Sequence, residues 1–194
     1  LGRTSVQGRV AIAPGEARPR VTANFSGPLV DLSELPSAQP KPGEPNPLLA
    51  ADVEAEIRFN RVVLPDRRAL GPVSGNARLA AGSVELKQFT VEVDGAAATL
   101  DGKINDPLKP AGLELMMNAK VTHTAGLSAF TGLGLQNFPA VTASGRLTDV
   151  PDGYALAGLT LAHAAATMAG DVTVTRGAKR FKVSAKASSP LLDF

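Results

Sequence analysis

The feature that most constrains this chain is the alternation of apolar and polar side chains with a period of two residues. It is clearest over residues 52–60, 113–122 and 181–188, where apolar residues occupy every second position. Successive side chains of a β-strand point to opposite faces, so each stretch predicts a strand with one apolar and one polar face. This pattern is typical of antiparallel sheets that contact solvent on one side. We therefore expect an all-β, antiparallel fold.

A second pattern is a break in the alternation that occurs twice. Residues 84–93 match residues 154–163, and both segments lose the alternation at the same place, Lys87-Gln88 and Ala157-Gly158. An extra residue that restores the apolar face is what a β-bulge supplies. The sequence therefore predicts two bulged strands at equivalent places in a repeated unit.

The neighbouring segments extend this repeat. Gly-Asn-Ala-Arg-Leu at 75–79 and Gly-Arg-Leu at 145–147 precede the bulged strands, and Ala-Ala-Ala-Thr follows them at 96–99 and 164–167. We expect these segments to occupy equivalent places in two units of about four strands each, both closing on an alternating strand.

The repeats predict one continuous β domain, in which four-strand meander units form a curved, twisted sheet that is open as a groove. Residues 1–35 are expected to be the end of a preceding repeat, and residues 36–50 a Pro-rich loop. Residues 51–135 are predicted to form a repeat unit with a capping turn, and residues 136–194 a second repeat unit. Short helical turns are expected at the junctions, over residues 29–35, 125–134 and 191–194.

Composition limits the function classes. The 194 residues carry 20 basic and 18 acidic side chains, a net charge of +2 that argues against a nucleic-acid-binding surface. The lack of cysteine excludes disulfides, thiolate metal sites and a cysteine nucleophile. No run approaches the roughly 18 apolar residues of a membrane span, and no signal peptide is recognisable. We expect the chain to be a piece of a longer polypeptide.

Residues with catalytic potential do not form a recognisable constellation. The sequence contains no Gly-x-Ser-x-Gly, phosphate loop or His-Glu-x-x-His motif. His163 aligns with Val93 and is expected to be a wall residue of the apolar face, whereas His123 follows a strand end and is expected to be exposed. Without a carboxylate cluster beside these histidines, no metal site is predicted. We expect no cofactor and no enzymatic activity.

Two basic turns are weaker candidates for a binding role. Arg67 and Arg68 follow an apolar strand, and Arg176, Lys179 and Arg180 surround a hairpin tip. Solvated turns explain both clusters. The alternative interpretation is a rim at which these side chains contact lipid phosphates or an anionic surface.

The main candidate site is the apolar face of the predicted sheet. A closed sandwich core and an open groove would both use such a face, and on pattern alone the closed core is the commoner outcome. Small residues on this face, at Gly8, Gly102, Gly145 and Gly170, would thin the wall or permit strong curvature. The predicted lining residues are Val10, Ile12, Phe25, Ile57, Phe59, Leu86, Phe89, Val91, Leu113, Leu115, Met117, Leu156, Leu159, Leu161, Val172, Phe181 and Val183.

Several segments together resemble the AsmA-like proteins of Gram-negative bacteria, within the wider group of bridge-like lipid-transfer proteins that have a repeating β-groove. The resemblance implies an inner-membrane anchor followed by a long periplasmic β-structure, whose apolar trough holds phospholipid tails. It covers most of the chain through patterns of strand and turn. The segments are Val30–Leu35, Ala51–Leu64, Gly71–Leu79, Val84–Val93 and Ala98–Ile104.

We therefore expect a periplasmic β-groove module, part of a longer inner-membrane-anchored protein, that binds phospholipid or another acyl lipid. It would help to move this lipid between membranes and so influence outer-membrane assembly. The expected partners are lipid and membrane proteins, and not nucleic acid. The alternative is a closed β-sandwich, a structural or adhesion module that binds a protein partner by strand addition.

Overall fold

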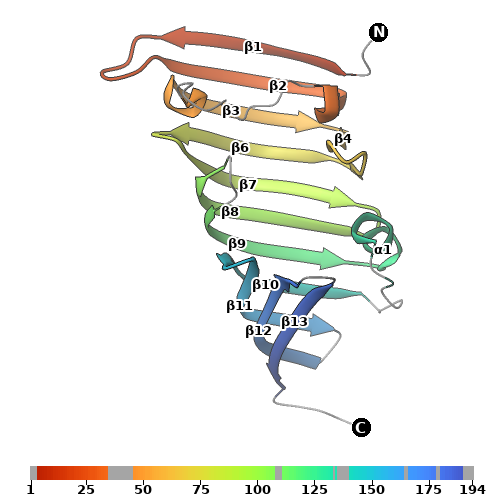
Figure 1. Ribbon diagram of the computed structural model, residues 1–194. Coiled ribbons are helices and arrows are strands. Elements are labelled where there is room, and N and C mark those ends of the chain that lie inside the picture. The colour runs from red at the N-terminus through yellow and green to blue at the C-terminus, as the bar shows by residue number, and fades with distance from the viewer. Residues whose placement is uncertain are drawn as a thin grey trace.

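The chain is built as a ladder of strands, most of which run antiparallel to their neighbours (Figure 1). The computed structural model describes residues 4–34, 46–107, 111–132, 134, 140–163, 166–177 and 180–189. The strands form a single open sheet of 13 strands. They are β1 (Ser5–Ala13), β2 (Arg20–Asp31), β3 (Asp52–Phe59), β4 (Val62–Val63), β5 (Ala69–Leu70), β6 (Val73–Ala80), β7 (Ser83–Val93), β8 (Ala96–Asp106), β9 (Ala111–Val121), β10 (Val141–Val150), β11 (Gly153–His163), β12 (Ala166–Arg176) and β13 (Phe181–Ser188).

From β6 to β13, each strand pairs antiparallel with the strand that follows it in the sequence. Several of these strands are joined by tight hairpins, whereas α1 lies in the longer connection between β9 and β10. Between β6 and β7, Ala81 and Gly82 have φ angles of 49° and 81°. Two consecutive residues with positive φ match the right-handed twist of the flanking strands. The antiparallel meander predicted from the alternation is therefore confirmed.

Two pairs depart from the predicted antiparallel arrangement, and both involve β2. β2 is parallel to the short β4, with Val30 opposite Val62. β2 and β3 are also parallel, with Arg20 opposite Asp52 and Gly27 opposite Phe59. The chain must therefore return along the whole of β2, about 40 Å at 3.3 Å per residue, before β3 begins. A parallel connection of this kind needs a long crossover, which accounts for the length of the segment between these strands. Most of the predicted Pro-rich loop, 36–50, lies outside the described residues.

Both predicted bulges are present. The pairing of β7 with β8 shifts between Leu86 and Phe89, and that of β11 with β12 shifts between Leu156 and Leu159. In each case two residues lie between the shifted pairs without a cross-strand partner on β8 or β12. We refer to β6–β9 as the first unit and to β10–β13 as the second unit, because aligning their bulges brings all four strands into correspondence.

A carboxylate stabilises each bulge. Gln88 and Gly158 have φ angles of 48° and 59°, which leave their backbone N–H groups out of the ladder. The N–H of Gln88 donates to Asp101 Oδ1 at 2.7 Å, and the N–H of Gly158 donates to Asp171 Oδ1 at 2.9 Å. The repeat therefore preserves the hydrogen bond that satisfies the bulge as well as the bulge itself.

The predicted equivalence of the two Ala-Ala-Ala-Thr segments is wrong. In the bulge-aligned units, Ala96 pairs with Val93 and Ala166 pairs with His163, so Ala96 corresponds to Ala166. The segments 96–99 and 164–167 are therefore two residues out of step. A displacement of two keeps every side chain on its face, which is why the alternation did not reveal it.

The helical elements fall at the expected junctions. Helix α1 (Ala125–Thr131) lies within the predicted turn at 125–134 and ends at Gly132, whose φ is 71°. The 3₁₀ turn η1 (Leu32–Glu34) lies within 29–35, while the predicted turn at 191–194 lies outside the described residues. A second 3₁₀ turn, η2 (Pro47–Leu49), precedes β3. In the described part of the chain, no helix combines the length and hydropathy needed to cross a membrane.

The closed β-sandwich is wrong for the described residues. Their strands belong to one sheet whose ends do not meet, with β1 at one end and β13 at the other. Closure would require a second sheet against the apolar face, or a bond between the end strands. The predicted open, largely antiparallel sheet is confirmed.

Candidate functional site

The register of the sheet places the predicted lining residues on one face. Directly paired residues share a face, and the pairs run unbroken across the strands, as in Phe25 with Ile57 and Leu100 with Met117. For Phe181 only the backbone is described, and it pairs with Arg176. The lining residues that share this apolar face are Val10, Ile12, Phe25, Ile57, Phe59, Leu86, Phe89, Val91, Leu113, Leu115, Met117, Leu156, Leu159, Leu161, Val172 and Val183.

The middle of the apolar face is filled by its own side chains. Leu86, Leu113 and Leu115 are buried, with Leu115 only 4% exposed. Leu86 lies in β7, whereas Leu113 and Leu115 both lie in β9. Gly102 of β8 stands between Leu86 and Leu115 in the register. A glycine there lets the flanking leucines approach each other above the strand. The four predicted glycines, at positions 8, 102, 145 and 170, all lie on this face by register.

A second buried cluster covers one edge of the apolar face. Val30 at the end of β2, Val62 in β4 and Val73 in β6 form its centre, and Phe59 and Phe89 pack against it. The short β4–β5 hairpin supplies this cover. Val30, Val62 and Val73 were not among the predicted lining residues. The signal for Val62 was the apolar run Val62-Val63-Leu64, which is too short for alternation to be measured.

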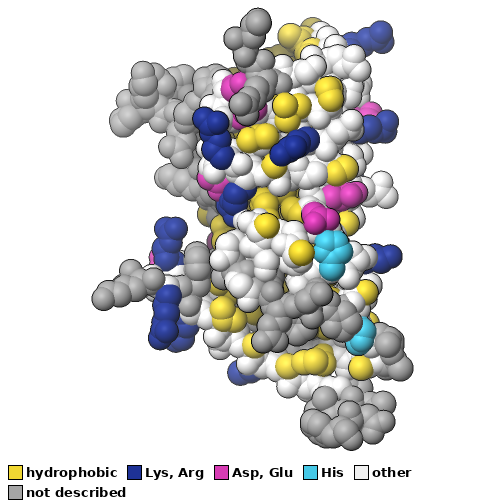
Figure 2. Space-filling view, turned by 90° about the vertical axis from the view of Figure 1, so that its right-hand side faces the viewer, with side chains coloured by type: hydrophobic (Ala, Val, Ile, Leu, Met, Phe, Trp, Pro, Cys, Tyr) yellow, Lys and Arg dark blue, Asp and Glu magenta, His cyan; other side chains and the backbone are white. Residues whose placement is uncertain are grey.

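Toward both ends of the sheet the apolar face is open. Val10 and Ile12 in β1 are 54% and 73% exposed, and Val183 in β13 is 64% exposed. Viewed from the side of the sheet where α1 lies, separate groups of hydrophobic side chains are exposed among charged ones over the height of the sheet (Figure 2). The exposed apolar side chains of β1 and β13 are therefore the candidate contacts for an apolar partner.

The polar face is organised as a ladder of alternating charges. Glu54, Arg78, Glu85, Lys103 and Glu114 follow one another in register across β3, β6, β7, β8 and β9. Glu54 and Arg78 approach to 3.7 Å. A hollow of about 410 Å³ lies over this region, but each charged side chain that lines it has a partner of opposite sign. The ladder therefore explains these charges by cross-strand pairing.

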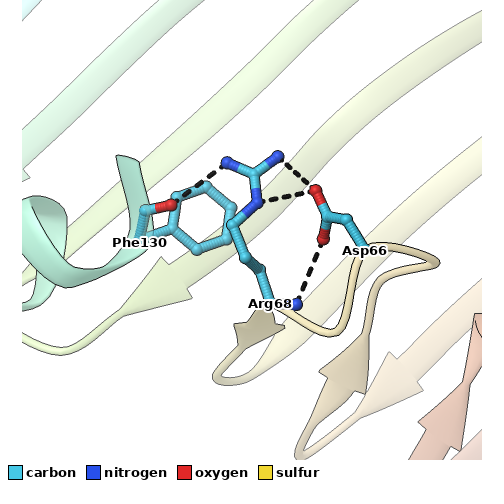
Figure 3. Close-up of polar contacts among 3 residues, drawn as sticks. All are labelled: Asp66, Arg68 and Phe130. Atoms are coloured by element: carbon cyan, nitrogen blue, oxygen red, sulfur yellow. Dashed lines mark hydrogen bonds and ion pairs between the residues drawn. The ribbon is translucent and has the colours of Figure 1, made fainter. Parts of the chain in front are cut away.

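Arg68 serves as a clamp. Its guanidinium contacts Asp66 Oδ2 at 2.6 and 2.7 Å, donates to the Phe130 carbonyl at 3.1 Å, and lies 4.8 Å from the centre of the Phe130 ring (Figure 3). The hydrogen bond from Arg68 lowers the pKa of Asp66, and the same bond raises the pKa of Arg68. The clamp joins the β4–β5 turn to α1. The neighbouring Arg67 is exposed, with a φ of 70°.

The other predicted basic cluster lies at the opposite ends of the strands. Pairing places the end of β12 beside the start of β11, and the register across β10, β9 and β8 places both on the side of the sheet where β7 begins. The Arg68 turn instead lies near the end of β7. Arg176 and Arg180 are exposed and, within the described ranges, form no ion pair with a carboxylate. Lys179 lies outside the described residues.

The histidines have local partners. Nδ1 of His163 lies 2.7 Å from the Ala140 carbonyl, and Nε2 of His123 lies 3.5 Å from Asp94. By register His163 lies on the apolar face, as predicted, but at an exposed strand end. The described residues contain no group of three or more histidine, aspartate or glutamate side chains placed to hold a metal ion.

Comparison with known proteins supplied no relative. No family model, curated protein or solved structure matched the chain.

Proposed function

We propose that this chain is a β-groove module that binds the acyl chains of phospholipid or another lipid against its apolar face. The observation that carries the proposal is the open apolar face, on which Ile12 and Val183 near the two ends of the sheet stand 73% and 64% exposed. The AsmA-like resemblance fits the same role: a periplasmic part of a longer, inner-membrane-anchored protein that moves lipid between membranes and influences outer-membrane assembly.

Transport of this kind needs no catalytic residue or cofactor. Each methylene group removed from water contributes about 0.8 kcal/mol, so even half of a long acyl chain gains several kcal/mol before the cost of ordering it. Apolar side chains that share one face from β1 to β13 offer similar contacts at successive positions along the sheet. A lipid can then exchange one set of contacts for the next without leaving the face.

The proposal is tested by a charge on the open face. Val183→Asp places a carboxylate on the apolar face at an exposed position, where it can stay hydrated, so the fold should survive. Ser184→Asp, the next residue on the same strand, is the matched control on the polar face. We expect native mass spectrometry with lipid extraction to find bound phospholipid on the unmodified chain and on Ser184→Asp, and clearly less on Val183→Asp. Equal lipid on both variants, or none on the unmodified chain after incubation with phospholipid vesicles, would contradict the proposal.

A second candidate function is binding of a protein partner by strand addition. The observation that favours it is that β1 and β13 each pair on one side only, within the described residues. An edge of this kind presents unpaired backbone groups to an incoming strand. Proline substitution in β13 at a position whose N–H points outward would weaken such binding, whereas lipid binding would continue.

A further inference from the structure

The apolar face of the second unit carries a hollow. It has a volume of about 140 Å³ and lies over Gly170, between Leu159 and Leu161 on β11 and Ala185 and Ala187 on β13. An apolar cavity of about 150 Å³ is large enough to hold a hydrocarbon the size of benzene. The hollow therefore has room for the end of an acyl chain.

The hollow arises from a change in side-chain volume between equivalent positions. In the first unit, the pair beside the bulge is Leu100 with Met117. In the second unit, the corresponding pair is Gly170 with Ala187. The backbone pairing is the same, so the lost side-chain volume is left as space on the apolar face.

The two units also carry opposite charges at the end of their third strand, β8 in the first unit and β12 in the second. Arg176 in β12 corresponds to Asp106 in β8, since the two pair with Phe181 and Ala111 at equivalent places. By alternation along β12, Arg176 lies on the same face as Gly170. Tyr154, 45% exposed, is its diagonal neighbour across β11, because Tyr154 pairs with Val174.

The spacing of these two features fits an acyl chain. Arg176 lies six positions after Gly170, about 20 Å along an extended strand. The chains of one leaflet span about 15 Å, half of the hydrocarbon core, and the phosphate group adds to that length. Val172 and Val174 continue the apolar strip between the two features. Asp149, on this face, accepts a hydrogen bond from the Leu113 N–H at 2.7 Å. Asp152 is the carboxylate residue beside Arg176: its carbonyl accepts from the Arg176 N–H at 2.7 Å, but in the described part of the chain its carboxylate forms no ion pair with Arg176.

We propose that β11–β13 form a seat for one acyl chain of an anionic phospholipid, with the phosphate at Arg176 and the methyl end in the hollow over Gly170. This inference rests on the proposed function and adds a fixed location and orientation to it. The seat has an exposed cation at one end and an apolar hollow at the other. It therefore fits an amphiphile with an anionic headgroup and an apolar chain.

The orientation is tested with the unmodified chain and lysophosphatidylglycerol that carries a nitroxide near either end of its single acyl chain. We expect the label near the methyl end to broaden the NMR amide signals of Gly170 and Ala187 most strongly. The label near the glycerol should broaden those of Thr175 and Arg176. A reversed pattern, or strongest broadening on β1 or β3, would overturn the seat while leaving lipid binding intact. No saturable broadening at any strand would overturn both the seat and the proposed function.

Filling the hollow provides a second test. Ala187→Met introduces the residue that the first unit carries at the equivalent position, and should weaken binding of lysophosphatidylglycerol at least tenfold by displacing two or more methylene groups. Ser184→Met, on the polar face of the same strand, is the matched control and should leave the affinity unchanged. Gly170 itself is unsuitable, because a Cβ there would collide with the Lys186 carbonyl. Unchanged affinity in a folded Ala187→Met variant would overturn the seat.

Discussion

The two repeat units share a backbone and differ in what fills their apolar face. Both have four antiparallel strands, a bulge at the same place and an aspartate that satisfies it. Yet Leu115 in the first unit is 4% exposed, while its equivalent in the second unit, Ala185, is exposed. The two units therefore have the same strand pairing but differ in how closely side chains pack on their apolar face. The strands and the bulge can be conserved between units, while the volume of the side chains determines whether the face is packed or open.

The largest expected difference between the units is the loss of stability when aspartate replaces the residue at equivalent positions of the apolar face. Leu115→Asp would bury a carboxylate among Leu86 and Leu113, and we expect it to lower the free energy of unfolding by about 4 kcal/mol or more. Ala185→Asp should cost less than about 1 kcal/mol, because the carboxylate stays in water. Urea unfolding followed by circular dichroism measures both. Similar costs at the two positions would mean that the second unit's face is covered in solution.

Removing the aspartate that stabilises a bulge should have the same effect on stability in both units. Asp101→Ala and Asp171→Ala each remove the acceptor for a bulge N–H, and each should cost about 1 kcal/mol of unfolding free energy. The asparagine variants keep a side-chain oxygen at the same place and should recover part of the loss. A large cost in one unit and none in the other would show that the bulges are not equivalent in energy.

The smallest expected effect is on the pH dependence of folding stability, and it arises from a carboxyl group that the first unit does not have at the equivalent position. Asp149 in β10 accepts hydrogen bonds from the backbone N–H groups of Leu113 and Gly112, and these lower its pKa. The equivalent position in the first unit is Leu79. A carboxyl whose pKa is lowered by folding adds stability above its ordinary pKa, and that stability is lost as the pH falls through the lowered value.

Asp149→Asn should therefore lose less stability than the unmodified chain when the pH falls from about 5 to about 3. Thermal unfolding at the two pH values measures the difference. An identical loss in both proteins would show that the Asp149 carboxylate makes no contribution to acid sensitivity.

Local patterns predicted much of the architecture. The alternation at 52–60 and 113–122 placed strands and faces correctly, because a strand's side-chain period does not depend on its partners. The bulges at Lys87-Gln88 and Ala157-Gly158 were visible for the same reason: an extra residue breaks the period locally. Helix α1, Ala125–Thr131, falls within the turn that was predicted over 125–134.

Long-range features were missed or misjudged. The parallel pairing of β2 with β3 depends on where the chain returns after a long connection, and alternation does not encode strand direction. The cover that Val30 and Val62 provide requires two segments far apart in the sequence to meet. Arg68 looked like a free basic side chain, but its contacts with Asp66 and Phe130 depend on α1 docking beside the β4–β5 turn.

Sequence patterns were enough to place strands with one apolar face, to locate their bulges and to show that positive and negative charges nearly balance. The three-dimensional structure was needed to show that the sheet stays open, which parts of the apolar face are filled, and which basic residues have partners. The two kinds of information differ because alternation is a property of a single strand. Burial depends on the volumes of side chains that meet across several strands, as Leu100 with Met117 and Gly170 with Ala187 demonstrate.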